Sequence, residues 1–229
     1  MKNLRKKWQK EVFAINEKIK EEKSPYEIKM SGIDIAVLPN VFSPKYFNDS
    51  LYFAQRVRKI VKQKSLLEIG TGTGIIALFS ALNGAKVVAT DINPIAIKNA
   101  KLNFKKHKAK GSIRMGNIYD PIKDSEKFDY IFWNHPFNNW DKPVRNILQR
   151  AGFDYKYGGL EEYITKARKH LLPGGRLLVG TGNFADFETI KKIAKKNNYK
   201  MKLLEKIAQP LGRGIKSKIK NEFLIYEFV

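Results

Sequence analysis

LLEIGTGTG, residues 66–74, joins a short apolar strand pattern directly to a turn that has glycine at every second position. Such junctions open nucleotide-binding α/β units, because glycine lets the backbone turn sharply and lie against a ligand without an obstructing Cβ. A second strand pattern, KVVATD at residues 86–91, follows one helix later and ends in Asp91. Together they predict an adenosine-binding α/β domain in which the Asp91 carboxylate binds the ribose hydroxyls.

The glycine spacing distinguishes between two adenosine cofactors. Gly70, Gly72 and Gly74 alternate with threonines, whereas a dinucleotide fingerprint would have its third glycine three positions after the second, where Ile75 stands. This spacing favours S-adenosylmethionine over NAD. An ordinary strand-to-helix turn would also suit glycine, but a helix pattern follows at once, and Pro94 begins another helix just after the second strand.

Strand and helix patterns alternate along most of the chain, which is typical of a parallel sheet with helices on both faces. We expect an α/β fold with a Rossmann-like, seven-stranded, mostly parallel sheet and an antiparallel edge made by the last two strands. The strand patterns lie at residues 65–69, 86–90, 112–115, 128–133, 176–181, 200–207 and 222–229. The helix patterns lie at residues 49–63, 75–83, 94–107, 160–171 and 186–197. GRGIKSKIKN, residues 212–221, is expected to be a basic connecting loop.

The charge of the chain is strongly positive. Its 229 residues include 44 basic and 22 acidic side chains, which give a formal net charge of +22. The basic residues cluster at 98–110 and at 191–220. A basic surface attracts polyanions, so nucleic acid is the leading candidate partner. A solvated lysine-rich face would have the same composition.

Several classes of protein are disfavoured by composition. Cysteine is absent and the three histidines are scattered, so we expect no disulfide, no thiolate chemistry and no metal site. No apolar run approaches the roughly 20 residues of a membrane span, and the lysine-rich N-terminus lacks the apolar segment of a secretory signal. We therefore expect a soluble cytoplasmic protein that does not bind membranes.

The N-terminal part of the chain precedes the alternating pattern. Apolar residues recur at spacings of three and four over residues 3–23, which predicts an amphipathic helix. YEIKM and IDIAVLP flank Ser31 and Gly32 and predict a hairpin. We expect residues 1–44 to form a helix-and-hairpin extension of the α/β domain at residues 45–229. The helix either docks on the core, covers the active site as a lid or contacts RNA.

A candidate acceptor site follows the fourth strand. NHPF, residues 134–137, lies where open α/β sheets place ligands, outside the carboxyl ends of the strands. The loop at residues 138–158 is longer than packing requires and mixes aromatic with basic residues. Aromatic rings could stack on a base, and arginines could hold a phosphate or carboxylate. The candidate substrate-binding residues are Trp140, Arg145, Arg150, Tyr155 and Tyr157; some of these aromatics could instead fasten the loop to the sheet.

These motifs resemble those of class I S-adenosylmethionine-dependent methyltransferases. The resemblance rests on EIGTGTG, Asp91, Asn117 after the third strand and the NHPF tetrapeptide. PNVFSP at residues 39–44 and GGLEEY at residues 158–163 are similar to the "small methyltransferase" group, which includes rRNA and tRNA base amino-methyltransferases and release-factor glutamine methyltransferases. That group usually has Asn-Pro-Pro followed by Tyr or Phe, and here His135 replaces the first proline.

The resemblance implies a role for each residue of the tetrapeptide. The side-chain oxygen of Asn134 and the carbonyl of His135 would accept the two N–H hydrogens of an amide or exocyclic amine. Phe137 would stack on the planar group, with Pro136 completing the motif. The His135 imidazole could also take the released proton, since its unperturbed pKa lies near 6.5, or its ring could line the pocket or hydrogen-bond the neighbouring loop.

The resemblance also implies a binding site for S-adenosylmethionine. The first strand and its turn would lie beside the methionine part, Asp91 would bind the ribose, and two isoleucines would sandwich the adenine, whose amino group Asn117 would bind. Thr71 either contacts the methionine carboxylate or satisfies its own turn. The expected cofactor-binding residues are Glu68, Gly70, Thr71, Gly72, Gly74, Asp91, Ile92, Asn117 and Ile118.

Three enzymatic functions fit these expectations. The leading hypothesis is N-methylation of an exocyclic amine of rRNA or tRNA, with the basic clusters as the RNA-binding surface. A second is methylation of a protein glutamine. A third is an S-adenosylmethionine-dependent reaction on a small amino acid or metabolite, including chemistry other than methyl transfer. The third predicts a pocket enclosed by Trp8, Phe13, Trp140 and Tyr157.

Overall fold

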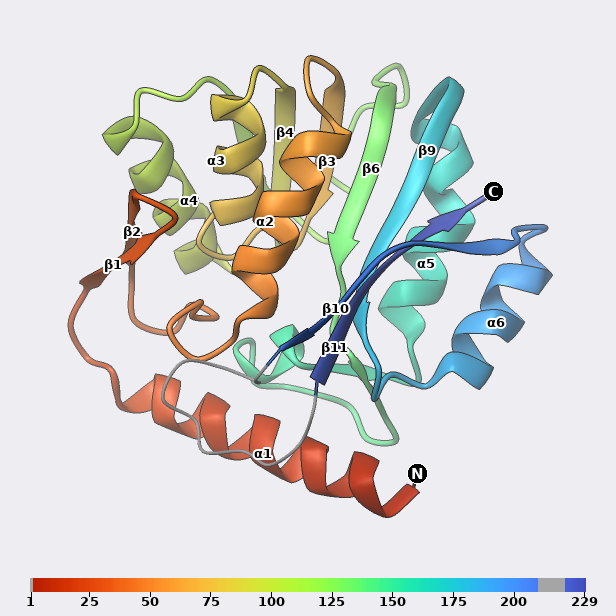
Figure 1. The fold of residues 1–229 in the computed structure, drawn as a ribbon, viewed down its shortest axis with the longest axis horizontal. Coiled ribbons are helices and arrows are strands. Elements are labelled where there is room, and N and C mark those ends of the chain that lie inside the picture. Colours follow the sequence, from red (N-terminus) through yellow and green to blue (C-terminus); the bar gives the residue numbers. More distant parts are fainter. Residues whose placement is uncertain (1, 210–220) are drawn as a thin grey trace.

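A seven-stranded sheet forms the centre of the molecule in the computed structural model, which describes residues 2–209 and 221–229 (Figure 1). In spatial order the strands are β10 (Met201–Gln209), β11 (Asn221–Phe228), β9 (Leu171–Gly182), β6 (Phe128–Asn134), β3 (Ser65–Ile69), β4 (Lys86–Asp91) and β5 (Ser112–Met115). β11 pairs antiparallel with both β9 and β10, whereas the pairs from β9 to β5 are parallel. The predicted fold class is confirmed.

Helices cover both faces of the sheet. They are α2 (Asp49–Ile60), α3 (Ile75–Leu82), α4 (Pro94–Lys106), α5 (Gly158–Lys166) and α6 (Phe187–Lys196), whereas α1 (Lys2–Glu21) lies at the end of the sheet. Because successive strand residues point to opposite faces, Leu66 and Phe132 pack in the apolar cluster that contains α2 and α3. Their neighbours Leu67 and Ile131 pack in the cluster that contains α5 and α6. The continuous apolar strand patterns therefore reflect burial on both faces.

The hairpin of β1 (Tyr26–Met30) and β2 (Ile33–Val37) is fastened to α4 by two buried amides. Asn103 Oδ1 accepts from the amide of Ala36 at 2.8 Å, and Asn99 Oδ1 accepts from the amide of Leu38 at 2.8 Å. Asn103 Nδ2 also donates to the carbonyl of Thr73 at 2.9 Å, within the glycine turn. These bonds satisfy backbone groups of β2 and hold the hairpin beside that turn.

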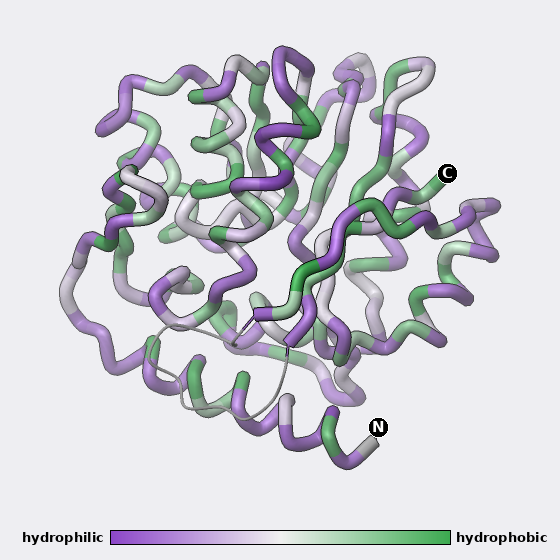
Figure 2. Tube along the Cα trace, in the orientation of Figure 1, coloured by the Kyte–Doolittle hydropathy of each residue, from purple (hydrophilic) through white to green (hydrophobic). Residues whose placement is uncertain are grey.

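The helix α1 lies across the carboxyl ends of the strands, toward which the arrowhead of β6 points in Figure 1. Figure 2 shows hydrophobic stretches alternating with hydrophilic ones along it. Trp8, Val12, Ile15 and Ile19 are buried and belong to the same apolar cluster as α2 and α3. The division of the chain at residue 44 stays a prediction.

Parts of the chain differ from the expected elements. The predicted loop at residues 138–158 contains a two-stranded parallel sheet, β7 (Asn138–Trp140) with β8 (Phe153–Tyr155), and a 3₁₀ turn at Gln149–Ala151. Strands of three residues are too short to produce a detectable period in the sequence. The expected basic loop at residues 212–221 falls almost wholly outside the described residues.

Two of the composition-based expectations can be compared with the described residues. None of the helices in residues 2–209 and 221–229 is long and apolar enough to cross a membrane. The same residues contain no group of three or more acidic or histidine side chains placed to hold a metal ion.

Replacing Gly74 with alanine should destabilise the fold by about 2–4 kcal/mol. The new Cβ would clash with α4, and alanine is strained in a left-handed backbone conformation. Gly74 has φ +81°, and a Cβ there would lie 2.8 Å from the Cβ of Ala100 on α4. Gly32 is a matched control, because it has φ +84° and open space around it, so Gly32→Ala should cost only about 1 kcal/mol. Urea unfolding measures both; equal losses would contradict the close contact of the turn with α4.

Candidate active site

A cavity of about 400 Å³ opens at the carboxyl ends of β3, β4 and β6. The glycine turn after β3 and the ends of β4 and β5 form one side, and the NHPF tetrapeptide after β6 forms the other. The segment at residues 143–155 and the helix α1 complete the enclosure. The cavity lies where parallel α/β sheets bind ligands.

A side chain at each of the three glycines of the turn would meet different surroundings. All three have positive φ: +64° at Gly70, +56° at Gly72 and +81° at Gly74. A Cβ on Gly70 would lie 2.8 Å from the indole nitrogen of Trp133, and one on Gly74 would meet Ala100. Only a Cβ on Gly72 would find nothing within 4 Å. Gly72 therefore leaves its side of the turn free for a ligand.

Gly74 belongs to the expected cofactor-binding set but does not line the cavity. It precedes the first residue of α3 and packs against Ala100 of α4, so its contact is with a helix. The other eight expected residues do line the cavity; they are Glu68, Gly70, Thr71, Gly72, Asp91, Ile92, Asn117 and Ile118.

A buried glutamate, Glu68, is hydrogen-bonded to the glycine turn. Glu68 is 1% exposed, and its Oε2 accepts a hydrogen bond from the hydroxyl of Thr71 at 2.7 Å. Burial raises the pKa of Glu68 to about 8, because the desolvated carboxylate is penalised more than the hydrogen bond compensates. Glu68 is thus protonated at neutral pH in this structure.

Asp91, at the end of β4, links this strand to the glycine turn that follows β3. Its Oδ2 accepts from the amide of Gly72 and its Oδ1 from the amide of Asn93, each at 2.8 Å. Desolvation raises the pKa of Asp91 above its ordinary value, although these backbone donors oppose the shift. Each carboxylate oxygen can accept further bonds, so the side chain fits a pair of ribose hydroxyls.

An apolar slot lies beside Asp91. Ile92 is 37% exposed, whereas Ile118 is 5% exposed, and both line the cavity. Asn117, between them in the wall, donates weakly from Nδ2 to Glu162 at 3.5 Å. Two aliphatic side chains with a polar amide between them are suited to a flat, nitrogen-rich ring such as adenine.

The amide of Asn134 is oriented by an acid that the sequence did not single out. Asn134 Nδ2 donates to Oδ2 of Asp49, the first residue of α2, at 2.9 Å. Asp49 is 5% exposed, and its burial raises the pKa of its carboxyl. Asn134 Oδ1 is buried and has no hydrogen-bond partner among the described residues. A buried acceptor without a donor is costly, so this oxygen is suited to an N–H of the acceptor substrate.

The His135 side chain packs inside the protein. It is 1% exposed, and its Nε2 lies 2.9 Å from the hydroxyl of Thr181 on β9. Burial lowers the pKa of His135 to about 3, so the ring is neutral at physiological pH and a poor proton acceptor. His135 lines the cavity, which was one of the expected alternatives, and its hydrogen-bond partner lies on β9 and not in the neighbouring loop.

Phe137 is held by its backbone. Its carbonyl accepts a 2.5 Å hydrogen bond from the hydroxyl of Tyr157, and its ring packs beside His135 and Phe223. Tyr157, a candidate substrate-binding residue, is fully buried and does not line the cavity. Tyr157 is the N-cap residue of α5 and has a left-handed backbone with φ +53°. Its buried side chain supports the tetrapeptide through the hydrogen bond to Phe137.

Some of the candidate substrate-binding residues at 138–158 line the cavity, and others lie outside it. Arg150 and Tyr155 line the cavity, as expected. Arg145 is exposed outside it, and Trp140 instead packs edge-to-face on Phe153 with ring centroids 4.9 Å apart. Arg145 and Trp140 therefore do not line the cavity, and Trp140, the last residue of β7, packs on Phe153 of the paired strand β8. Their role in substrate binding stays a prediction.

The N-terminal helix contributes to the enclosure. Trp8 and Val12 line the cavity, whereas Phe13, Trp140 and Tyr157 do not. Of the four residues expected to enclose a metabolite pocket, only Trp8 does so, because Phe13 is 48% exposed and packs against the outer side of Phe153. The indole nitrogen of Trp8 is buried with no hydrogen-bond partner among the described residues.

Sequence reasoning missed several cavity residues besides Asp49. Phe42 and Phe47 stack in the wall with centroids 4.3 Å apart, and Trp133 lies under the turn at Gly70. The acid at position 49 resembles an ordinary first-turn residue of a helix, where negative charge is common. Its burial next to β6 was the missing information, and no local pattern carries it.

The fold and the cavity define an α/β methyltransferase, and a family comparison places the chain. Residues 32–205 match the model of the family described as methyltransferase small domain, so the chain belongs to this family. It is an enzyme of the methyltransferase class, and S-adenosylmethionine is the methyl donor of the family.

Curated relatives of the chain act on more than one kind of acceptor. It is 31% identical over 190 residues to the "Putative protein N5-glutamine methyltransferase" of Methanocaldococcus jannaschii, covering 80% of this chain and 93% of the relative. It is 31% identical to the release factor glutamine methyltransferase of Geobacter sulfurreducens, covering 66% of this chain and 56% of the relative. It is 26% identical to ribosomal RNA small subunit methyltransferase C of Mannheimia succiniciproducens, covering 72% of this chain and 48% of the relative. The chain thus spans about half the length of the last two.

Solved structures share the fold. The 16S rRNA N2 G1207 methyltransferase of T. thermophilus, in complex with AdoMet and guanosine, superposes with a TM-score of 0.62 at 16% identity, covering 89% of this chain and 50% of that chain. The tRNA (uracil-54, C5)-methyltransferase of Pyrococcus abyssi superposes with a TM-score of 0.59 at 18% identity, covering 90% and 45%. At these identities the likeness concerns the architecture.

Substituting Glu68 should change how stability depends on pH. The folded-state pKa near 8 lies above the unfolded value of 4.5, so the unfolded chain releases a proton that the folded chain keeps. The stability conferred by this group is present at low pH and is lost as pH rises toward 8. Between pH 5 and 8 the wild type should lose on the order of 4 kcal/mol relative to Glu68→Gln. Urea unfolding across that range tests this; parallel curves would show an ordinary pKa.

Substituting Asp49 should slow methyl transfer without weakening donor binding. In Asp49→Asn the new amide can donate to Asn134 Oδ1 and turn that side chain, so we expect kcat to fall between about ten- and a hundredfold. Calorimetry with S-adenosylmethionine should give an unchanged Kd. Asp129→Asn is the matched control: it removes a carboxylate bonded to Ser65 at the opposite end of β6. Equal effects on kcat would refute the orienting role.

Proposed function

We propose that the chain is an S-adenosylmethionine-dependent N-methyltransferase that methylates an exocyclic amine of rRNA or tRNA. The observation that carries this proposal is the arrangement of Asn134, whose amide is fixed by Asp49 while its buried oxygen has no partner in the part of the chain that the structure describes. Such an oxygen is a specific acceptor for an N–H group. Phe137 in the same wall supplies an aromatic surface for a planar group.

The donor half of the cavity would hold S-adenosylmethionine. Gly72 leaves the turn open, Asp91 offers carboxylate oxygens to the ribose, and Ile92 and Ile118 provide apolar faces for the adenine. When bound, the donor supplies an electrophilic methyl group. The backbone of the turn would fix the position of the donor. Glu68 would not need to move, because it is already neutral and bonded to Thr71.

The acceptor half is suited to a nitrogen of low basicity. The lone pair of an exocyclic amine or amide is delocalised, so the group must be turned until that lone pair points toward the methyl carbon. Asn134 Oδ1 and the backbone carbonyl of His135 would take its two hydrogens. Phe137 would fix the plane of the group. The carbonyl role needs no proline at position 135, and the buried imidazole holds the backbone there through Thr181.

Basic side chains around the cavity support an RNA acceptor. The exposed residues near its enclosure include lysines on α1 and cationic residues of the segment after β7. They are Lys6, Lys7, Lys10, Lys142, Arg145, Arg150 and Lys156. Together with the net charge of +22, they would attract the phosphate backbone and bring a base to the cavity.

A protein glutamine is the second candidate acceptor, because the relative from Methanocaldococcus jannaschii is covered over 93% of its length. A glutamine amide offers the same two hydrogens as an exocyclic amine. The chemistry of Asn134 therefore suits both acceptors, and the basic surroundings favour RNA.

The experiment is incubation with methyl-labelled S-adenosylmethionine and, separately, total RNA, ribosomes, RNA-free protein extract and small-molecule extract. We expect label in RNA, and at least a hundredfold less with Asn134→Ala, since an acceptor bound in the wrong orientation reacts slowly. Lys62→Ala, on the exposed turn after α2, is the control and should keep wild-type rates.

Salt separates the two acceptors. Labelling of RNA should fall steeply between 50 and 200 mM salt, because phosphate contacts are replaced by counterions, by roughly tenfold or more. Label confined to a protein glutamine would assign the second candidate instead. Full activity of Asn134→Ala on any fraction would refute the orienting role of this residue.

A further inference from the structure

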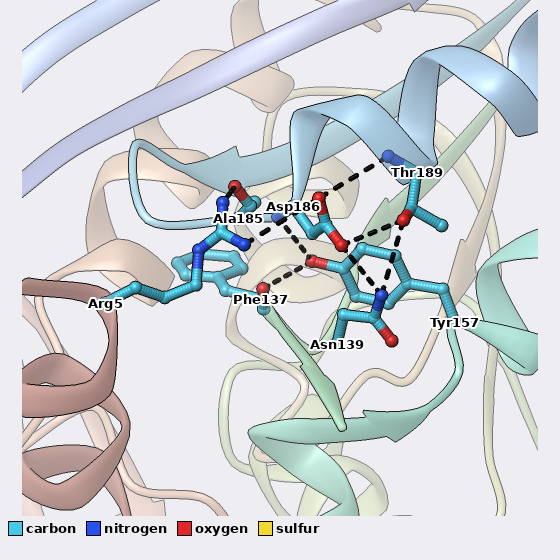
Figure 3. Close-up of polar contacts among 7 residues, drawn as sticks. All are labelled: Arg5, Phe137, Asn139, Tyr157, Ala185, Asp186 and Thr189. Carbon is cyan, nitrogen blue, oxygen red and sulfur yellow. Dashed lines mark hydrogen bonds and ion pairs between the residues drawn. The ribbon is translucent and has the colours of Figure 1, made fainter. Parts of the chain in front are cut away.

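Asp186 lies between the N-terminal helix and the acceptor tetrapeptide (Figure 3). It is the N-cap residue of α6, and its Oδ1 pairs with Nη1 of Arg5 on α1 at 3.7 Å. The same guanidinium donates from Nη2 to the carbonyl of Ala185 at 3.1 Å. One arginine of α1 thus holds both the side chain and the backbone of the loop before α6.

The other contacts of Asp186 lead to the tetrapeptide. Its backbone amide donates to the hydroxyl of Tyr157 at 3.2 Å, and that hydroxyl donates to the carbonyl of Phe137 at 2.5 Å. Its Oδ2 accepts from Asn139 Nδ2 at 2.9 Å and from the hydroxyl of Thr189 at 2.8 Å. Figure 3 shows the side chains of Arg5, Asn139, Tyr157 and Thr189 gathered around Asp186. Phe137 and Asn139 are therefore fixed by the residue that Arg5 holds.

The carboxylate stays charged at physiological pH. Desolvation alone would raise the pKa of Asp186, but the bonds from Asn139 and Thr189 and the charge of Arg5 together hold it below its ordinary value. The Arg5 side chain is 40% exposed, and an exposed ion pair by itself contributes little. The effect of this pair comes from its position, because the Asp186 carboxylate also accepts from the side chain of Asn139, and the Asp186 amide donates to the Tyr157 hydroxyl that holds the carbonyl of Phe137.

The helix α1 is additional to the part of the chain that matches the family model, which begins at residue 32. Nevertheless Trp8 and Val12 of α1 line the cavity. Trp8 stacks on Phe184 with ring centroids 5.4 Å apart, two residues before Asp186. The helix is also anchored farther along by the buried hydrogen bond from Asn16 to Gln149, at 3.1 Å. Loss of Arg5 would therefore shift one end of α1 and leave the helix attached.

We propose that Arg5 and Asp186 are positioning residues for methyl transfer, which couple the seating of α1 over the cavity to the placement of Phe137 and Asn139. The acceptor is oriented fully only when α1 is seated. This inference rests on the proposed function for the choice of acceptor; the coupling between α1 and the tetrapeptide is measured without one.

The first test needs no acceptor. Hydrogen exchange is followed in the peptide covering residues 134–140, with S-adenosylhomocysteine bound, in wild type, Arg5→Ala and Lys6→Ala. We expect exchange in Arg5→Ala to be faster by about three- to fivefold, the loss that corresponds to one part-exposed ion pair. Lys6→Ala removes an exposed charge one residue away and should leave the peptide unchanged. Unchanged exchange in Arg5→Ala overturns the coupling.

The second test measures catalysis on the RNA fraction. Arg5→Ala should lower kcat about fivefold with an unchanged Kd for S-adenosylmethionine, and Arg5→Lys should restore part of the loss. Asp186→Asn keeps an N-cap for α6 while removing the charge. The double variant Arg5→Ala/Asp186→Asn should be no slower than the slower single variant, as expected for residues that act through one contact.

Fully additive losses in the double variant would overturn the proposal, as would a loss of kcat in Arg5→Ala no larger than in Lys62→Ala. If RNA accepts no label but protein does, the proposed acceptor fails, and the same cycle is measured on the protein fraction. A faster exchange of residues 134–140 together with absent RNA labelling would thus separate the two failures.

Discussion

The close contact of the glycine turn with its two neighbours is the constraint on which the rest of the site depends. Gly70 allows the indole of Trp133 to approach the turn from β6, and Gly74 allows α4 to approach it from the other side. A side chain at either position would push one neighbour away. Because Trp133 precedes Asn134 and α4 begins just after Asp91, these two contacts set the distance between the acceptor half and the donor half of the cavity.

Much of this arrangement could be predicted from residues 65–134, where long periodic patterns and glycine chemistry indicate the same fold. That eight of the nine expected cofactor-binding residues line one cavity could be predicted from their positions, since parallel strands end at one edge of the sheet. Asp49 could not be predicted, because its partner Asn134 is 85 residues away and its acid resembles a helix start. Tyr157 and Trp140 were assigned to the substrate because aromatic residues in a long loop suggest stacking. Their burial depends on β7 and β8, whose three residues each give no periodic signal.

The polar atoms of the cavity are distributed in an informative way. The donor half is already bonded within the protein: Glu68 to Thr71, and Asp91 to the amides of Gly72 and Asn93. The cavity wall also contains the oxygen of Asn134 and the indole nitrogen of Trp8, which have no hydrogen-bond partner among the described residues. One part of the cavity is therefore already internally bonded, and another part has polar atoms that a ligand could satisfy.

The hydrogen bond between His135 and Thr181 couples the residue types that these two distant positions can hold. A proline at 135, as in the usual tetrapeptide, would leave the buried hydroxyl of Thr181 without its partner, and an apolar residue at 181 would do the same to the imidazole. Either single change costs the desolvation of an unpaired polar group, whereas changing both to apolar residues removes the cost. Chains with histidine at the second position of this motif, in place of the first proline, should therefore carry a hydrogen-bonding residue at the matching position of β9.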